Sequence, residues 1–245
     1  MNSSKPTVLV PVDASDPETY DRSIVNLFQT AKVIILGWYP VPDQSAPSQL
    51  RNQFEDEAKQ NIADLKQAFE TADIEVETLV AFSHSRPKSV DKAAEQTQAD
   101  FVLTPGKADQ FDRIVVSIRG EVNLTRITSV VGPLLSQHDG EVTIFGVIAP
   151  ESDEEDTRQL MNTAVSEFVD AGIDESRITW ETAQSDNVTE QVETFVSGYD
   201  LLIIGESEPS LASLTIGTIP ERIINAVSIP VLVVRNQDDS NNVSQ

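Results

Sequence analysis

Residues Leu201–Thr218, with the sequence LLIIGESEPSLASLTIGT, form the stretch that most constrains the fold. An apolar run ends at Gly205, small and polar residues follow, and Gly217 and Thr218 precede a helix-like segment, IPERIINAV. This order predicts a strand, a loop and the N-terminus of a helix. Unpaired backbone N–H groups at such a helix start carry a partial positive charge and suit a phosphate group. The stretch therefore predicts an anion site, and its occupant decides the function.

On both sides of this stretch, short apolar runs alternate with amphipathic segments, and the whole pattern occurs twice. Runs that are apolar on both faces are typical of strands in a covered parallel sheet, and the alternation predicts right-handed βαβ units. The second pass begins at Arg113, about 106 residues after Thr7, and it alone continues into a last loop, helix and strand. The predicted strands are 7–12, 32–39, 74–81, 100–104, 113–118, 141–148, 177–183, 200–205 and 230–234. The predicted helices are one capped by Ser15 or Asp16, then 48–71, 88–97 and 123–137, one from the acidic loop 151–156 to 170, 188–196, and one ending at 227.

A repeat of this length indicates two domains in tandem, because it is too long for the unit of a solenoid. The first domain is expected at 1–108, the second at 109–236, and a polar, disordered tail at 237–245. The fold class is α/β, with two doubly wound parallel sheets. The first domain lacks the terminal loop, helix and strand that complete the second.

The charge balance excludes several classes of partner. The chain of 245 residues has 40 acidic and 17 basic residues, a net charge of −23. Such a surface repels nucleic-acid phosphates and anionic membranes, so no nucleic-acid partner is expected. The acidic residues are dispersed along the chain, which predicts a halophilic host whose salt screens the self-repulsion. An ordinary acidic protein is the alternative.

The sequence lacks cysteine and the motifs of common catalytic sites. No cysteine is present, which excludes disulfides, thiolate metal sites and cysteine nucleophiles. The two histidines, His84 and His138, lie in unrelated loops, and no Gly-x-Ser-x-Gly elbow or phosphate-binding Gly-x4-Gly-Lys loop occurs. No catalytic residue, metal site or enzyme activity is predicted. The N-terminus lacks the features of a signal peptide, and no apolar run approaches about 18 residues, so a cytoplasmic protein without membrane insertion is expected.

Two segments carry a resemblance to a known family. They are VLVPVDAS at 8–15 and the ending LLIIGESE…GTIPERIINAVSIPVLVV within 201–234. On these residues the chain resembles the universal stress protein family in its tandem-domain form, whose domains are adenine nucleotide alpha hydrolase-like. The turn at Arg119-Gly120 resembles that of copies associated with amino-acid transporters, which implies a membrane transporter as one candidate partner.

The resemblance implies where a nucleotide would lie. In ATP-binding members an Asp after the first strand meets the adenine or ribose, and a Gly-x2-Gly-x9-Gly-Ser/Thr loop wraps the phosphates. The positions that match the first element are Pro11, Val12 and Asp13 in domain 1. Those that match the loop are Gly205, Ser207, Gly217 and Thr218 in domain 2, where Arg119 stands in place of the Asp.

Neither domain matches the complete pattern. Domain 1 runs from 104–106 directly into domain 2, so its phosphate loop is missing. In domain 2 the middle glycine position falls on Glu208, whose carboxylate would repel a phosphate. Several assignments stay open: Asp13 contacts a nucleotide or shapes its turn, Thr218 binds an anion or caps its helix, and Arg119 pairs with a ligand or with a nearby glutamate.

The sequence therefore predicts a non-catalytic regulatory protein of the universal stress type, with a degenerate nucleotide site and a protein partner or dimerisation as its mode of action. The alternative is a sensor that binds ATP or AMP in the domain 2 crevice. The resemblance implies that the last strand, Pro230–Val234, mediates dimerisation by edge pairing. Because only domain 2 has this strand, we expect a homodimer through domain 2 or an edge filled within the chain.

Overall fold

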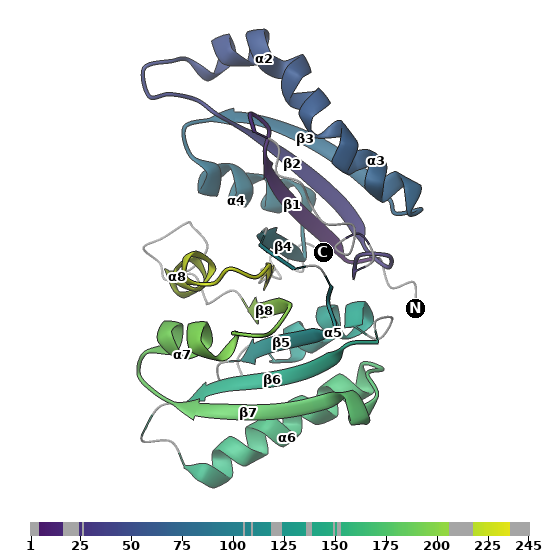
Figure 1. The fold of residues 1–245 in the computed structure, drawn as a ribbon, viewed down its shortest axis with the longest axis vertical. Helices are drawn as coiled ribbons and strands as arrows, with labels where there is room; N and C mark the ends of the chain where they lie inside the picture. Colours follow the sequence, from purple (N-terminus) through teal and green to yellow (C-terminus); the bar gives the residue numbers. More distant parts are fainter. Residues whose placement is uncertain are drawn as a thin grey trace, which may run out of the picture.

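The chain folds around a single mixed β-sheet with helices on both faces (Figure 1). The computed structural model describes residues 5–16, 25, 27–104, 106–108, 110–118, 124–135, 139–148, 150, 153–205 and 218–235. These residues form a nine-stranded sheet of order β3-β2-β1-β4-β9-β8-β5-β6-β7. The strands are β1 (Thr7–Asp13), β2 (Lys32–Pro40), β3 (Val76–Ser83), β4 (Phe101–Thr104), β5 (Arg113–Ile118), β6 (Glu141–Ile148), β7 (Ile178–Gln184), β8 (Leu201–Gly205) and β9 (Val231–Val234). The helices are α2 (Pro47–Asn61), α3 (Ala63–Thr71), α4 (Arg86–Thr97), α5 (Leu124–Leu135), α6 (Glu154–Asp170), the 3-10 turn η1 (Glu175–Arg177), α7 (Val188–Phe195) and α8 (Thr218–Ala226).

The predicted doubly wound, mostly parallel α/β class is confirmed. The two sheets that were expected are joined by the antiparallel pairing of β4 with β9 into one mixed sheet. Two element predictions were wrong. The single helix expected over 48–71 is divided at Ile62 into α2 and α3. The buried Ile62 side chain packs against Gly37, where an added Cβ would lie 3.2 Å from Ile62 Cγ2. The third strand begins at Val76 because Asp73 has a positive φ of 60° and the Ile74 N–H still donates to Phe69 in the preceding helix.

The strand β9 joins two sets of strands. Strands β1 to β4 run parallel to one another, and β5, β6, β7, β8 and β9 do the same. β9 pairs in parallel with β8, where Leu232 faces Ile203, and antiparallel with β4, where Leu232 faces Leu103. Of the two expected outcomes for this strand, the structure therefore has the edge filled within the chain. Both edges of β9 are occupied, so a homodimer cannot form on it while β4 is in place.

The apolar core is continuous on one face of the sheet and divided on the other. On the first face, residues from α2, α3, α5 and α6 pack over both sets of strands, and Leu103 and Leu232 lie in the same cluster. On the second face, α4 covers β1 and β2, while α7 and α8 cover β5, β8 and β9. The two sets of strands, which we call the N-terminal half (β1–β4) and the C-terminal half (β5–β9), therefore share one buried layer.

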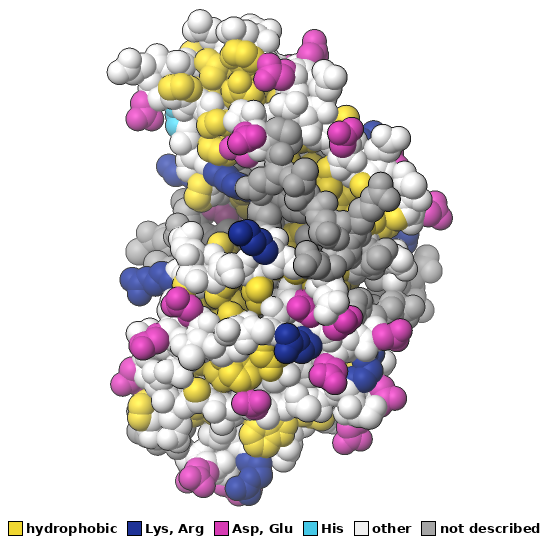
Figure 2. Space-filling view, in the orientation of Figure 1, with side chains coloured by type: hydrophobic (Ala, Val, Ile, Leu, Met, Phe, Trp, Pro, Cys, Tyr) yellow, Lys and Arg dark blue, Asp and Glu magenta, His cyan; other side chains and the backbone are white. Residues whose placement is uncertain are grey.

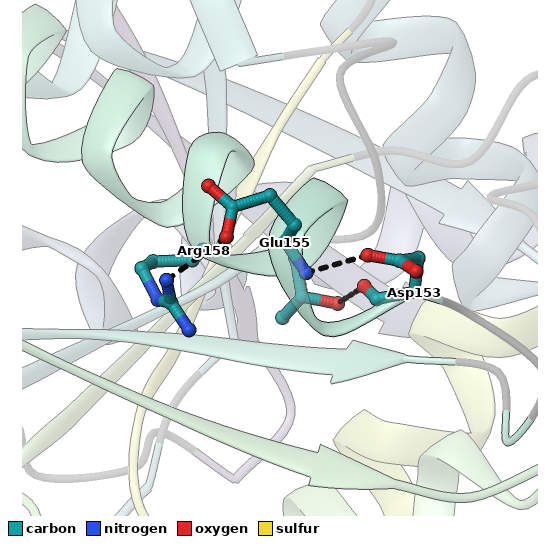
Figure 3. Close-up of polar contacts among 4 residues, drawn as sticks. Asp153, Glu155 and Arg158 are labelled. Carbon is teal, nitrogen blue, oxygen red and sulfur yellow. Dashed lines mark hydrogen bonds and ion pairs between the residues drawn. The ribbon is translucent and has the colours of Figure 1, made fainter.

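The acidic loop predicted at 151–156 is partly helical. Glu154, Glu155 and Asp156 form the first turn of α6, where negative charge complements the positive end of the helix. Asp153 caps this turn: its Oδ1 accepts from the Glu155 N–H at 2.7 Å, and Arg158 pairs with Glu155 at 2.9 Å (Figure 3). This acidic cluster therefore has a local role in starting the helix. None of the helices in the described part of the chain is both long and apolar enough to span a membrane.

Candidate functional site

Each half of the sheet has one point where a ligand crevice would be expected. In doubly wound sheets, ligands bind outside the carboxyl ends of the strands where the strand order reverses. This switch point lies between β1 and β4 in the N-terminal half and between β5 and β8 in the C-terminal half. Because β4 and β9 are antiparallel, Thr104 at the carboxyl end of β4 pairs with Val231, while Gly205 at the carboxyl end of β8 pairs with Val234. The two switch points thus lie at opposite ends of the strands, and the candidate residues of the two halves do not form one site.

Two positions of the predicted phosphate loop are described at the C-terminal switch point. Gly205 is the last residue of β8 and is half-buried, and Thr218 is the first residue of α8. The structure thus places one predicted position at a strand end and the other at a helix start. Arg119, Ser207 and Gly217 lie outside the described residues, as do Glu206, Glu208 and His138.

In the N-terminal half, Asp13 shapes the turn that follows β1. Its Oδ1 accepts from the Ser15 N–H at 2.8 Å and from the Ser15 hydroxyl at 2.7 Å. Of the two interpretations left open by the sequence, this geometry supports the turn. Pro11 and Val12, which precede it, are buried within β1, and the Val12 side chain belongs to the core. Their side chains are therefore not exposed to a ligand.

The same turn occurs at a place far from either switch point. Asp174, at the start of η1, accepts from the Ser176 N–H at 2.9 Å and from the Ser176 hydroxyl at 2.6 Å. These hydrogen bonds to Ser176 lower the pKa of the Asp174 carboxyl below its usual value. An Asp-x-Ser sequence thus forms this hydrogen-bonded turn at two unrelated places, so the turn at Asp13 does not require a ligand.

Arg86 links the start of α4 to the end of β1. Its guanidinium donates to the carbonyl of Pro11 at 2.9 Å, and the side chain is half-buried. Arg86 was not predicted as a site residue, although it lies two residues after His84. The sequence shows only that Arg86 comes directly before a proline in the first turn of the helix that crosses over β1. A contact between residues 75 positions apart depends on the crossover and cannot be seen in the local sequence.

Other polar groups around this switch point also bond to the protein. The Asn61 amide donates to the carbonyl of Ala14 at 2.8 Å, and a ring nitrogen of the exposed His84 lies 2.9 Å from the carbonyl of Val41. Burial, followed by the nearby charges of Glu57 and Asp13, raises the pKa of the Tyr39 phenol. Negative potential at Tyr39 does not favour an anionic ligand.

The segment after β4 occupies the place where a phosphate loop would begin. Lys107 donates its N–H to the carbonyl of Ser228 at 2.9 Å. A Cβ on Gly106 would lie 2.2 Å from the carbonyl carbon of Ile229 and 2.3 Å from the nitrogen of Pro230. Glycine is needed here because two backbones approach each other directly. The chain thus enters its second half packed against the residues that precede β9.

The described His, Asp and Glu side chains do not form a candidate metal site. Within those residues, no three His, Asp or Glu side chains gather in a way that could hold a metal ion. The described histidine, His84, bonds to a backbone carbonyl and has no carboxylate or hydroxyl partner among the described contacts.

The arrangement of strands is shared with solved structures. A universal stress protein from Archaeoglobus fulgidus DSM 4304 aligns with 96% of this chain and 98% of its own, with a TM-score of 0.65 and 13% identity. The chain has the universal stress protein fold. A protein provisionally described as a universal stress protein from Pseudomonas aeruginosa UCBPP-PA14 aligns with 95% of this chain and 94% of its own, with a TM-score of 0.56 and 13% identity. A functionally unknown protein from Pseudomonas aeruginosa PAO1 aligns with 95% of this chain and 93% of its own, with a TM-score of 0.54 and 13% identity.

The sequence comparisons give no further assignment. No protein-family model matches the chain, and no curated protein matches it either. At 13% identity the likeness to solved structures carries the universal stress fold and no residue roles.

Proposed function

We propose that this chain is a non-catalytic regulatory protein, built of two universal-stress-type domains in tandem, that acts by binding a protein partner. One observation carries the proposal. Around the N-terminal switch point, the described polar groups are used by the protein itself: Asp13 bonds Ser15, Arg86 bonds Pro11, and residues 106–107 pack on the segment before β9. Because these described polar groups already have partners within the protein, they favour binding through surfaces over binding of a nucleotide in this half.

The shared strand β9 gives a reason for the tandem arrangement. If domain 1 ends near residue 108, it has no fifth strand of its own, and the buried residues of β4 need the pairing with β9. The second domain then supplies in one chain what a homodimer would supply by edge pairing. We therefore expect the full-length protein to be a monomer. Both the domain boundary and the oligomeric state are part of the proposal.

The alternative is an adenine-nucleotide sensor whose site lies at the C-terminal switch point. Gly205 and Thr218, at the end of β8 and the start of α8, favour it, while Glu208, which lies between them in the sequence, opposes it. Thermal unfolding of the full chain in concentrated KCl, with and without millimolar ATP-Mg or AMP, separates the two. A ligand at 100 times its Kd stabilises the folded state by about 2.7 kcal/mol, which is readily measured as a higher midpoint.

We expect no shift for the natural sequence and a shift for Glu208→Gly with ATP-Mg, because the glycine removes the carboxylate and permits close backbone approach. Glu193→Lys, an exposed change on α7 that also reduces the negative charge, is the matched control and should not gain binding. A shift for the natural sequence would replace the proposed function with the sensor.

A further inference from the structure

The strand β7 leaves one edge of the sheet open. It is the last strand of the nine, and among the described strands it pairs with β6 alone. Its four central residues, Thr179–Thr182, are exposed, and Trp180 is 39% exposed. In Figure 2, apolar side chains come to the surface at the level of β7 and α6, with acidic side chains nearby. An exposed strand edge presents backbone groups to which another strand can be added.

The opposite edge of the sheet, β3, is better covered. Its second half is half-buried or buried, and α2 and α3 pack against it. At its exposed beginning, Lys32 bonds Glu77 at 2.7 Å, so a positive charge lies beside that edge. β7 contains neither Lys nor Pro, the residues that commonly protect edge strands, and its one charged residue is Glu181. The nearest arginine along the chain, Arg177, is turned away and donates to the carbonyl of Gly140.

The hydrogen bonds of β7 fix which of its backbone groups face outward. The N–H of Ser185, directly after the strand, donates to the carbonyl of Ile148 in β6 at 2.9 Å. Backbone groups of successive residues in a strand point to alternate sides. The N–H and C=O groups of Thr182 and Trp180 therefore point away from β6, toward the open edge. Glu181 lies between Trp180 and Thr182 in the strand, so its side chain is on the opposite face of the sheet from theirs.

We propose that an extended, basic segment of a protein partner adds as a strand to the open edge of β7. Main-chain hydrogen bonds to Trp180 and Thr182 supply affinity, and Lys or Arg opposite Glu181 supplies selectivity. The net charge of −23 attracts such a basic segment. The same charge repels a second copy of this chain, because the Glu181 of each copy would approach the acidic edge of the other. This inference names the surface for the partner in the proposed function, and it rests on that function.

The test uses the full-length protein at low salt and a phage library of random peptides about ten residues long, enough for a complete strand. We expect selected peptides that alternate Lys or Arg with β-branched residues, and whose binding changes the fluorescence of Trp180. Trp180 and Trp38 are the two tryptophans of the chain, so Trp38→Phe should retain the change and Trp180→Phe should lose it.

Two substitutions address the mechanism. Thr182→Pro removes an outward N–H without removing a hydrogen bond to β6, and it should abolish binding. Glu181→Lys, which keeps the backbone intact, should weaken binding by about tenfold or more, while the control Glu193→Lys makes the same charge change on α7 and should have little effect. Circular dichroism confirms that each variant is folded, and Glu181→Lys serves as the decisive variant if Thr182→Pro does not fold.

Four results would overturn the proposal: no enriched peptide, enrichment of acidic peptides, equal weakening by Glu181→Lys and Glu193→Lys, or a dimer by light scattering that Thr182→Pro or Glu181→Lys disrupts. The last result would make the occupant a second copy of the chain. The proposed function fails separately, since nucleotide-dependent unfolding of the natural sequence would refute it whether or not peptides bind β7.

Discussion

The two halves of the sheet have the same strand order but are completed differently. The C-terminal half has its own fifth strand, β9, and the helix α8 that precedes it. The N-terminal half has four strands and relies on β9 for the edge of β4, where Phe101 and Leu103 are fully buried. One half is therefore complete and the other is completed by its neighbour. The difference shows how two unequal sets of strands can share one strand, β9.

The largest expected effect comes from separating the halves. Residues 1–108 alone should fail to fold cooperatively, because the edge of β4 and its apolar side chains lose their cover. Residues 109–245 should fold and form a dimer, because the second edge of β9 becomes free. Circular dichroism and light scattering on the two fragments measure both outcomes. A folded N-terminal fragment, or a C-terminal fragment that stays monomeric, would show that the halves do not depend on β9 in this way.

A smaller effect should follow when the contact between the two backbones is crowded. Gly106→Ala places a methyl group against the backbone of Ile229 and Pro230 and should cost about 1–3 kcal/mol of unfolding free energy. Gly146→Ala, in the complete half, is the matched control, because its new methyl group meets the flexible end of the Met161 side chain. Urea unfolding should give the larger loss for Gly106→Ala. The reverse order would mean that the segment after β4 adjusts easily.

A still smaller change tests the turn at the N-terminal switch point. Asp13→Ala removes two hydrogen bonds to Ser15 and should lower the unfolding free energy by about 1–2 kcal/mol. Asp13→Asn keeps an acceptor oxygen and should lose less. Neither variant should change the response to ATP-Mg. If Asp13→Ala left stability unchanged but altered nucleotide binding, the carboxylate would be a ligand contact.

The smallest effect concerns pH and the half-buried Tyr39. Burial, with the charges of Glu57 and Asp13, raises the pKa of this phenol above its usual value of about 10. In the unfolded chain the phenol ionises first, so the contribution of Tyr39 is fully present below about pH 10 and is lost as the pH rises through the folded pKa. The Tyr39→Phe variant should lose less stability across this window in urea unfolding. If the natural protein and Tyr39→Phe lost the same unfolding free energy over this pH range, the ionisation of Tyr39 would not account for the loss.

Much of the fold could be predicted from local patterns. The strand limits of β5 and β6 were predicted to the residue, because short β-branched runs bounded by turn residues are a strong signal. The break at Ile62 could not be predicted, since the helical periodicity continues across it; in the structure the Ile62 side chain packs beside Gly37 on another element. At the site, the position of Asp13 at a strand end was predicted, and its use in a turn was one of two predicted alternatives. The contact of Arg86 with Pro11 was not predicted. The binding roles of Arg119, Ser207 and Gly217 stay predictions.

The sequence by itself determined the parallel α/β class and the repeat of the strand pattern. These features follow from the periodicity of apolar residues and from what the chain contains. Only the tertiary structure decided that β9 fills the edge of β4 and that it does so antiparallel, which sends the two switch points to opposite ends of the strands. The apolar residues of a strand are compatible with either direction of pairing, and the packing of two whole layers selects one of them.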